Sequence, residues 1–224
     1  MEILSGLLPN PANYRVGRSA DIKYIVIHYT ANKGDSALNN TRYFANNTVK
    51  ASAHFFVDEN SIYTSVPIGD TAWHCGGGLQ GKGGHAWFGK CSNSNSIGIE
   101  MCLLSNSGDV KKKTIQNTVE LVKYLMKKYN ISSKNVIRHW DVTGKNCPAP
   151  FIGDNNAYWE DFKNRIESEE NLTMGQFEEL KSMLVQLSAR VEDIAQENNR
   201  QNTIIDLVGK DIQNIAKTLD ELKE

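Results

Sequence analysis

The C-terminal end of the chain carries an unbroken heptad repeat, which constrains the fold more than any other feature of the sequence. Counted from Phe177, apolar residues occupy nearly every first and fourth position for about seven heptads, with one polar layer. A helix of about 48 residues would be about 72 Å long, so we expect it to form a separate coiled coil. The first positions are Phe177, Leu184, Val191, Asn198, Ile205, Ile212 and Leu219, and the fourth positions are Leu180, Leu187, Ile194, Gln201, Val208, Ile215 and Leu222.

The positions that flank this repeat favour an assembly of more than two helices. They hold Met183, Ala195, Ile204, Gly209 and Ala216 more than the paired charges that favour dimers. This broadens the apolar stripe that neighbouring helices must cover. We therefore expect residues 177–224 to make the protein a homo-oligomer, a trimer or tetramer in preference to a dimer.

Residues 1–167 show the pattern of an α/β domain. Apolar and β-branched runs at 22–28 and 96–104 predict strands, and the runs at 54–57 and 62–66, separated by turn formers, predict a hairpin. Helical spacing at 114–129 and a first helix near 36–46 alternate with these strands, whereas residues 75–94 predict a long surface loop. We expect a mixed central β-sheet flanked by helices, then a linker at 168–176.

Composition excludes several classes of function. The near balance of 25 basic and 26 acidic residues argues against nucleic acid as the main partner. The sequence contains no run of eighteen apolar residues, so we expect no stable membrane insertion. The first nine residues lack the pattern of a signal peptide, so we expect synthesis in the cytoplasm. Four scattered cysteines are too few for a disulfide framework and predict reduced thiols, with one possible metal ligand.

Two histidines and a cysteine form a candidate metal site. His28 ends a predicted strand, and His139 is followed by Cys147 after a segment that contains Gly144 and precedes Pro148, so one tight loop would bring both side chains round one ion. Three protein ligands with one open position define a catalytic zinc site, and mixed His and Cys donors suit Zn²⁺. Taken singly, each residue is more simply explained as a structural histidine or a buried thiol.

Five ordered sequence blocks span nearly all of residues 22–150. They are Tyr-Ile-Val-Ile-His-Tyr-Thr at 24–30, Ser-Ala-His-Phe at 52–55, Ala-Trp-His at 72–74, Ser-Ile-Gly-Ile-Glu at 96–100, and Arg-His-Trp-Asp at 138–141 continued by Gly-Lys-Asn-Cys-Pro at 144–148. Together they resemble the type-2 N-acetylmuramoyl-L-alanine amidase family, which includes phage endolysins and the peptidoglycan-recognition proteins. The resemblance implies a zinc hydrolase that cuts peptidoglycan between N-acetylmuramic acid and L-alanine.

The resemblance also assigns roles to individual residues. It implies that His28, His139 and Cys147 bind the metal, that Glu100 is the catalytic acid–base, and that Lys145 is the active-site lysine. Some phage members have an assisting tyrosine before the His-Phe pair, but that position is Ala53 here, which leaves Glu100 as the better candidate. We expect Glu100 to move the proton and Lys145 to stabilise the oxyanion.

Four further residues are candidates for substrate binding. His54, Trp73, His74 and Asn95 lie in or beside the matching blocks, although the histidines could instead orient a ligand or serve the fold, Trp73 could be core, and Asn95 could serve its own turn. The role of His85 in the glycine-rich loop also stays open.

The leading functional hypothesis is a phage or prophage endolysin that reaches the cell wall after release through a membrane lesion of the holin type. Its helical tail would cluster the catalytic heads on a polymeric substrate. Two alternatives are a non-catalytic peptidoglycan-binding module, which the presence of Cys147 disfavours, and an interaction protein in which the coiled coil is the main part. Cytosolic recycling of muropeptides is a further possibility.

Overall fold

The chain divides into two compact units, which are described separately: residues Met1–Glu169 and Glu170–Glu224. The computed structural model describes residues 2–81, 83–104, 109–153, 156–168 and 174–221, and in the C-terminal helix it describes side chains from 181 to 214. Within these ranges no helix combines the length and the apolar character needed to cross a membrane.

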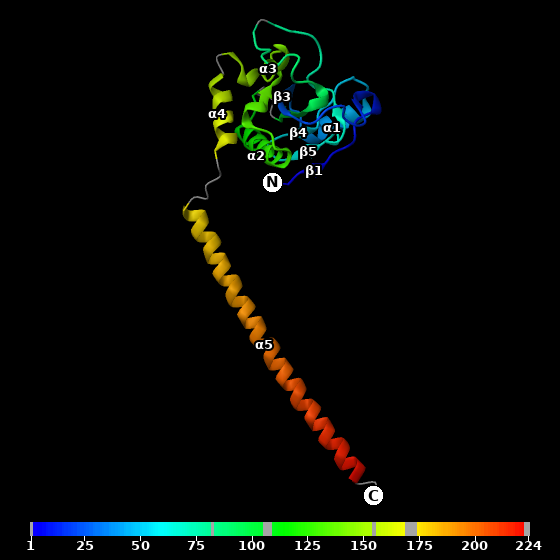
Figure 1. The fold of residues 1–224 in the computed structure, drawn as a ribbon, viewed down its shortest axis with the longest axis vertical. Helices are drawn as coiled ribbons and strands as arrows, with labels where there is room; N and C mark the ends of the chain where they lie inside the picture. The colour runs from blue at the N-terminus through cyan, green and yellow to red at the C-terminus, as the bar shows by residue number, and fades with distance from the viewer. Residues whose placement is uncertain (1, 82, 105–108, 154–155, 169–173, 222–224) are drawn as a thin grey trace. The chain divides into compact units, whose positions relative to one another are not determined.

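A six-stranded sheet in the order β1-β5-β4-β7-β3-β8 forms the centre of the first unit (Figure 1). The two long central strands, β3 and β7, are parallel, and β8 and β4 extend the sheet in parallel on either side. β5 pairs antiparallel with β4, which confirms the predicted hairpin. The strands are β1 (Leu4–Ser5), β3 (Tyr24–Lys33), β4 (Phe55–Val57), β5 (Ile62–Thr64), β7 (Ser96–Leu103) and β8 (Val136–Arg138), and a second small sheet pairs β2 (Tyr14–Arg15) with β6 (Thr71–Ala72).

Helices cover both faces of the sheet, as the sequence predicted. α2 (Lys112–Tyr129) and α4 (Asn156–Glu167) bury Leu121, Leu125 and Phe162 against Ile27 and Ile99 of the central strands. α1 (Ala37–Asn46) packs its Ala37 on the opposite face. Successive side chains of a strand point to opposite faces. The even-numbered residues of β3 and β7, which include His28 and Glu100, therefore face away from the α2–α4 core.

β3 is longer than predicted, and the expectation that His28 ends this strand was wrong. The strand runs to Lys33 with an irregular register between Tyr29 and Lys33, where Ala31 has a φ of 58°. The neighbouring strand β8, however, pairs only as far as Ile27. His28 therefore lies where one side of β3 becomes free of backbone pairing, and side chains from the following segment can approach it.

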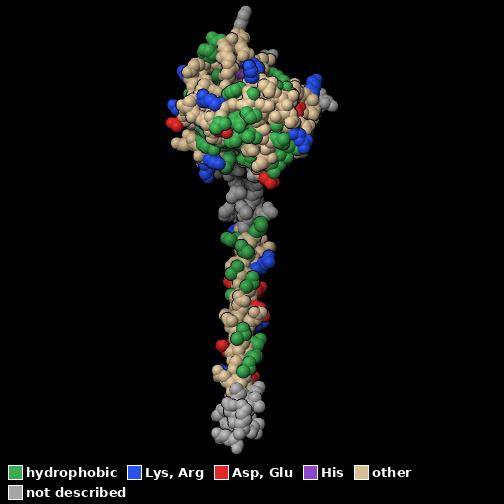
Figure 2. All heavy atoms as spheres, turned by 90° about the vertical axis from the view of Figure 1, so that its right-hand side faces the viewer, with side chains coloured by type: hydrophobic (Ala, Val, Ile, Leu, Met, Phe, Trp, Pro, Cys, Tyr) green, Lys and Arg blue, Asp and Glu red, His purple; other side chains and the backbone are tan. Residues whose placement is uncertain are grey.

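The second unit is one helix, α5 (Met174–Glu221), which passes through Gly209 without a break. The first- and fourth-position apolar residues in the described part are 50–68% exposed in the single chain, and Figure 2 shows hydrophobic side chains recurring along it. These residues are Leu184, Leu187, Val191, Ile194, Ile205, Val208 and Ile212. The repeat residues Phe177, Leu180, Ile215, Leu219 and Leu222 lie outside the described side chains, as residues 169–173 of the predicted linker lie outside the described structure.

Candidate metal centre

His28 and Glu100 lie side by side on the two central strands. They are direct partners in the register of β3 and β7, and both face away from the α2–α4 core. His28 is 1% exposed. Glu100 is half-buried, and its Oε2 atom is closed off from solvent without a hydrogen-bond partner in the described structure. The unusual acid in an apolar strand thus has a place next to the histidine.

His139 and Cys147 come from the segment that follows β8. α3 (His139–Thr143) begins as the strand ends, and Gly144 closes it in the left-handed conformation, with a φ of 81°. The chain then folds back, and the backbone N–H of Trp140 donates to the carbonyl of Cys147 over 2.9 Å. An ion pair between the buried Arg138 and the half-buried Asp141, at 2.9 Å, holds the start of the turn. The loop thus brings the side chains of His139 and Cys147 close to His28, as its length and its glycine predicted.

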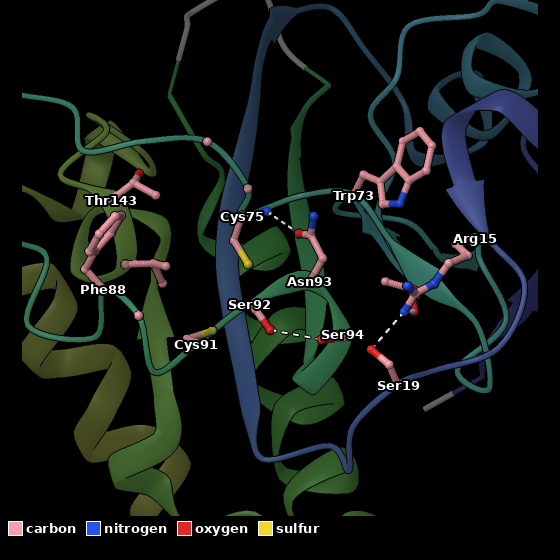
Figure 3. Close-up of a pocket in the computed structure, with 15 residues that line it drawn as sticks. Arg15, Ser19, Trp73, Cys75, Phe88, Cys91, Ser92, Asn93, Ser94 and Thr143 are labelled. Carbon is pink, nitrogen blue, oxygen red and sulfur yellow. Dashed lines mark hydrogen bonds between the residues drawn. The ribbon is translucent and has the colours of Figure 1, made fainter.

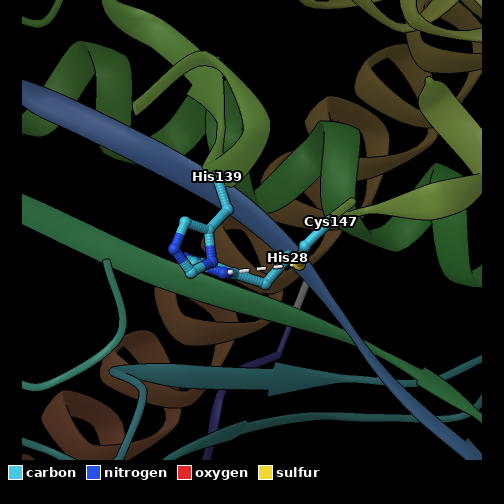
Figure 4. A group of neighbouring side chains, drawn as sticks. All are labelled: His28, His139 and Cys147. Atoms are coloured by element: carbon cyan, nitrogen blue, oxygen red, sulfur yellow. Dashed lines mark hydrogen bonds between the residues drawn. The ribbon is translucent and has the colours of Figure 1, made fainter. Parts of the chain in front are cut away.

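The three side chains converge on one point (Figure 4). One nitrogen or sulfur atom from each of His28, His139 and Cys147 lies within 4.8 Å of the others, and Nδ1 of His28 is 3.7 Å from Sγ of Cys147. A tetrahedral zinc ion separates a nitrogen and a sulfur ligand by about 3.6 Å. Both ring nitrogens of the buried His139 also lack a hydrogen-bond partner among the described residues. The donor set therefore fits a zinc ion.

Burial sets the protonation of the two histidines. It holds the pKa of His28 well below its usual range, and the neighbouring His139, His74 and Lys145 lower it further. Burial, with the charge of Lys145, lowers the pKa of His139 to about 4. Both imidazoles are therefore neutral near pH 7 and keep the lone pairs that a metal needs.

Burial acts in the opposite direction on the acidic groups. It raises the pKa of Glu100 to about 7, although the positive charge of the exposed Lys145 pulls this pKa down. Burial and the neighbouring Glu100 raise the pKa of Cys147 to about 12. A metal ion would have to displace the thiol proton, which makes metal binding pH-dependent.

The glycine-rich loop, residues 75–94, holds α3 and the segment that leads to Cys147 in place. Backbone N–H groups of Gln80, His85 and Trp87 donate to carbonyls of α3, at 2.6, 3.1 and 2.9 Å. Gly84 lies so close to Trp140 that a Cβ atom there would be 2.4 Å from its carbonyl oxygen. The sequence predicted a long loop here but not this function.

The four predicted substrate-binding residues occupy different environments. The ring of Trp73 lines a pocket beside Arg15 and Asn93 (Figure 3). His54 is 0% exposed, and its Nδ1 accepts from the backbone N–H of Gly98. Both polar groups of the Asn95 side chain bond within its own turn, to Ser92 and Lys90. Substrate contact by these residues stays a prediction.

His74 lies against the candidate metal centre. Its Nδ1 is 3.0 Å from Nε2 of His28, and the two rings meet edge to face. It is joined on its far side to Ser96, at the start of β7. Nothing in the sequence singles out Ser96, although the glycine two residues later in the same strand is a signal that something packs closely there.

Comparisons with known proteins match the first unit. Residues 18–150 match a protein family described as N-acetylmuramoyl-L-alanine amidase. The chain is 38% identical over 154 residues to the amidase BlyA of Bacillus subtilis, which covers 66% of this chain and 41% of BlyA. It is 36% identical over 168 residues to the amidase XlyA of the same organism, covering 74% of this chain and 51% of XlyA. The chain thus spans about half or less of the length of these relatives.

Solved structures agree with the sequence comparison. The catalytic domain of XlyA superposes with a TM-score of 0.60 at 34% identity, covering 74% of this chain and 99% of that domain. PlyL gives a TM-score of 0.62 at 29% identity, covering 75% of this chain and 98% of the PlyL chain. The residues that match the family, 18–150, include the segments that carry His28, Glu100, His139 and Cys147.

Proposed function

The chain belongs to the N-acetylmuramoyl-L-alanine amidase family, and on that premise we propose that residues 1–167 are a zinc-dependent catalytic domain. The bond it hydrolyses is the amide between N-acetylmuramic acid and L-alanine in bacterial peptidoglycan. The observation that carries the proposal is the buried group of three potential metal ligands, His28, His139 and Cys147. On the adjacent strand, one carboxylate oxygen of Glu100 has no hydrogen-bond partner among the described residues.

The chemistry that zinc supplies when bound is Lewis acidity, which acidifies water and polarises a carbonyl group. Ionised Glu100 accepts the proton of the attacking water and passes it to the departing amine of L-alanine. The ammonium group of Lys145, whose charge already acts on Glu100, stabilises the negative charge that develops on the lactyl carbonyl oxygen. Each side chain thus has a separate task in one hydrolysis.

Metal removal and reconstitution test this proposal. The full chain should contain one zinc per molecule, lose its activity on purified cell walls after treatment with a chelator, and regain the activity with zinc. The variant Cys147→Ala should contain little zinc and stay inactive when zinc is added. Full activity of the metal-free protein, or of this variant, would overturn the zinc-dependent mechanism.

We further propose that the protein acts as a phage or prophage endolysin. A mutant endolysin from Bacillus subtilis superposes on this chain at 34% identity with a TM-score of 0.60. In this proposal the enzyme acts on the wall after release from the cytoplasm. When the chain is produced inside host cells together with a holin, the cells should lyse. They should survive when the variant Glu100→Gln is produced in its place.

We also propose that α5 joins several copies of the chain. Among its described side chains, seven exposed apolar residues occupy first and fourth positions of the heptad repeat, and an exposed apolar stripe of this size marks a protein interface. Residues 177–224 would then form a trimer or tetramer. Sedimentation equilibrium of the full chain should give three or four times the mass of one chain, and a monomer at micromolar concentration would contradict the proposal.

A further inference from the structure

A chain of hydrogen bonds starts at His28 and leads away from the proposed metal ligands. Its Nδ1 faces Cys147, while its Nε2 lies 3.0 Å from Nδ1 of His74. Nε2 of His74 lies 3.2 Å from the hydroxyl of Ser96. That hydroxyl is 2.6 Å from the backbone carbonyl of Ser92. The four groups form one continuous relay from the metal centre to a backbone carbonyl.

The carbonyl of Ser92 fixes the direction of every bond in this relay. A carbonyl oxygen can only accept, so Ser96 uses its single hydroxyl proton to donate to Ser92. The Ser96 oxygen must then accept from His74, which places the proton of a neutral His74 on Nε2. Nδ1 of His74 is left as an acceptor, and it accepts a hydrogen bond from the Nε2–H group of His28.

Nδ1 of His28 is consequently the nitrogen without a proton. This is the atom that lies 3.7 Å from the sulfur of Cys147, where a metal would need a lone pair. The opposite tautomer of His28 would point an N–H group at the metal and leave two acceptors facing each other in the relay. We propose that His74 and Ser96 are positioning residues that hold His28 in its metal-binding tautomer.

Two features of the fold hold the His74 ring in this position. The side-chain oxygen of Asn93 accepts from the backbone N–H groups of His74 and Cys75, and Figure 3 shows the second of these bonds. Gly98 lies beneath the ring, and a Cβ atom at that position would come within 2.5 Å of Cγ of His74. The absence of a side chain at Gly98 makes room for the ring beside His28.

Zinc affinity tests the relay separately from catalysis, because the inference rests on the proposed metal site but not on the reaction. In competition with a chelator, His74→Leu should bind zinc about 10–100-fold more weakly than the wild-type full chain, and Ser96→Ala should show a loss at the lower end of this range. His74→Gln should recover much of the affinity, since its amide group can accept from His28 and donate to Ser96. Thr118→Val removes another buried hydroxyl that donates to a carbonyl, in helix α2, and should bind zinc like the wild type.

The tautomer can be observed directly in the metal-free protein. Nitrogen-15 NMR of the histidine rings should show the proton of His28 on Nε2 in the wild type, and a mixture of tautomers in Ser96→Ala. A wild-type His28 with its proton on Nδ1 would overturn the relay. So would zinc affinities of Ser96→Ala and Thr118→Val that are equal, or a loss in His74→Gln as large as in His74→Leu. A wild type that binds no zinc would instead refute the proposed metal site itself.

Discussion

At the scale of single residues, a change at Glu100 should abolish proton transfer without affecting metal binding. Its carboxylate lies beside His28 but is not one of the three grouped donors. The variant Glu100→Gln keeps the shape of the side chain and removes the base, so turnover should fall by about 10²–10⁴-fold while the zinc content stays at one per chain. Initial rates of wall hydrolysis and metal analysis on the same samples check this. A variant with wild-type turnover would exclude Glu100 as the base.

Lys145 should set the pH at which Glu100 becomes active. Because its positive charge lowers the pKa of Glu100, its removal in Lys145→Met raises that pKa. Glu100 accepts a proton only when it is ionised, so activity is lost as the pH falls through its pKa, and the loss should begin at a higher pH in the variant. Profiles of kcat/KM against pH measure this position independently of the maximal rate. The matched change Lys90→Met, in the glycine-rich loop, should leave the profile in place.

The grouping of the three proposed metal ligands could be predicted from the sequence, but the hydrogen bonds around them could not. His28, His139 and Cys147 are recognisable because zinc requires particular donor types, and a short loop with a glycine can bring two of them together. The tautomer of His28 depends instead on a hydroxyl and a carbonyl that meet only after β7 and the preceding turn have formed. No spacing in the sequence encodes the direction of those bonds.

At the scale of elements, Gly144 connects α3 to the glycine-rich loop. It has a φ of 81°, and a Cβ atom would lie 2.0 Å from the carbonyl oxygen of Gln80. Gly89 has a similar φ of 75° but no atom within 4 Å of that position. The shared backbone cost cancels, so the free energy of unfolding should fall by about 1–3 kcal/mol more in Gly144→Ala than in Gly89→Ala. Urea denaturation of the two variants measures the difference, and equal losses would show that the loop does not need this close contact.

The sequence predicted elements well where hydrophobic periodicity is strong. The strand at 96–104, the hairpin and the helix at 114–129 all appear within a few residues of their expected bounds. The end of β3 was misjudged because the strand continues beyond His28 through two half-buried and three exposed residues that carry no periodic apolar signal. The attachment of the glycine-rich loop to α3 uses backbone groups, which every residue possesses, so the sequence could not indicate it.

At the scale of the whole molecule, the head and the tail should make separable contributions. The family match ends at residue 150, before α5, whose exposed apolar stripe is suited to clustering the heads. Clustering raises the effective concentration of catalytic sites on a polymer but offers nothing on a small substrate. Deletion from Thr173 onward should therefore leave turnover of soluble muropeptides unchanged and weaken lysis of whole walls. Equal lysis by both forms would rule out a role for clustering.

The bond that is cut tests the central claim most directly. Mass spectrometry of purified peptidoglycan digested by the zinc-loaded full chain should show glycan strands with free lactyl carboxyl groups and stem peptides with a new L-alanine N-terminus. Digestion by Glu100→Gln under the same conditions should yield neither product. Cleavage of a glycosidic bond or of a bond within the peptide, with the lactyl amide intact, would contradict the account.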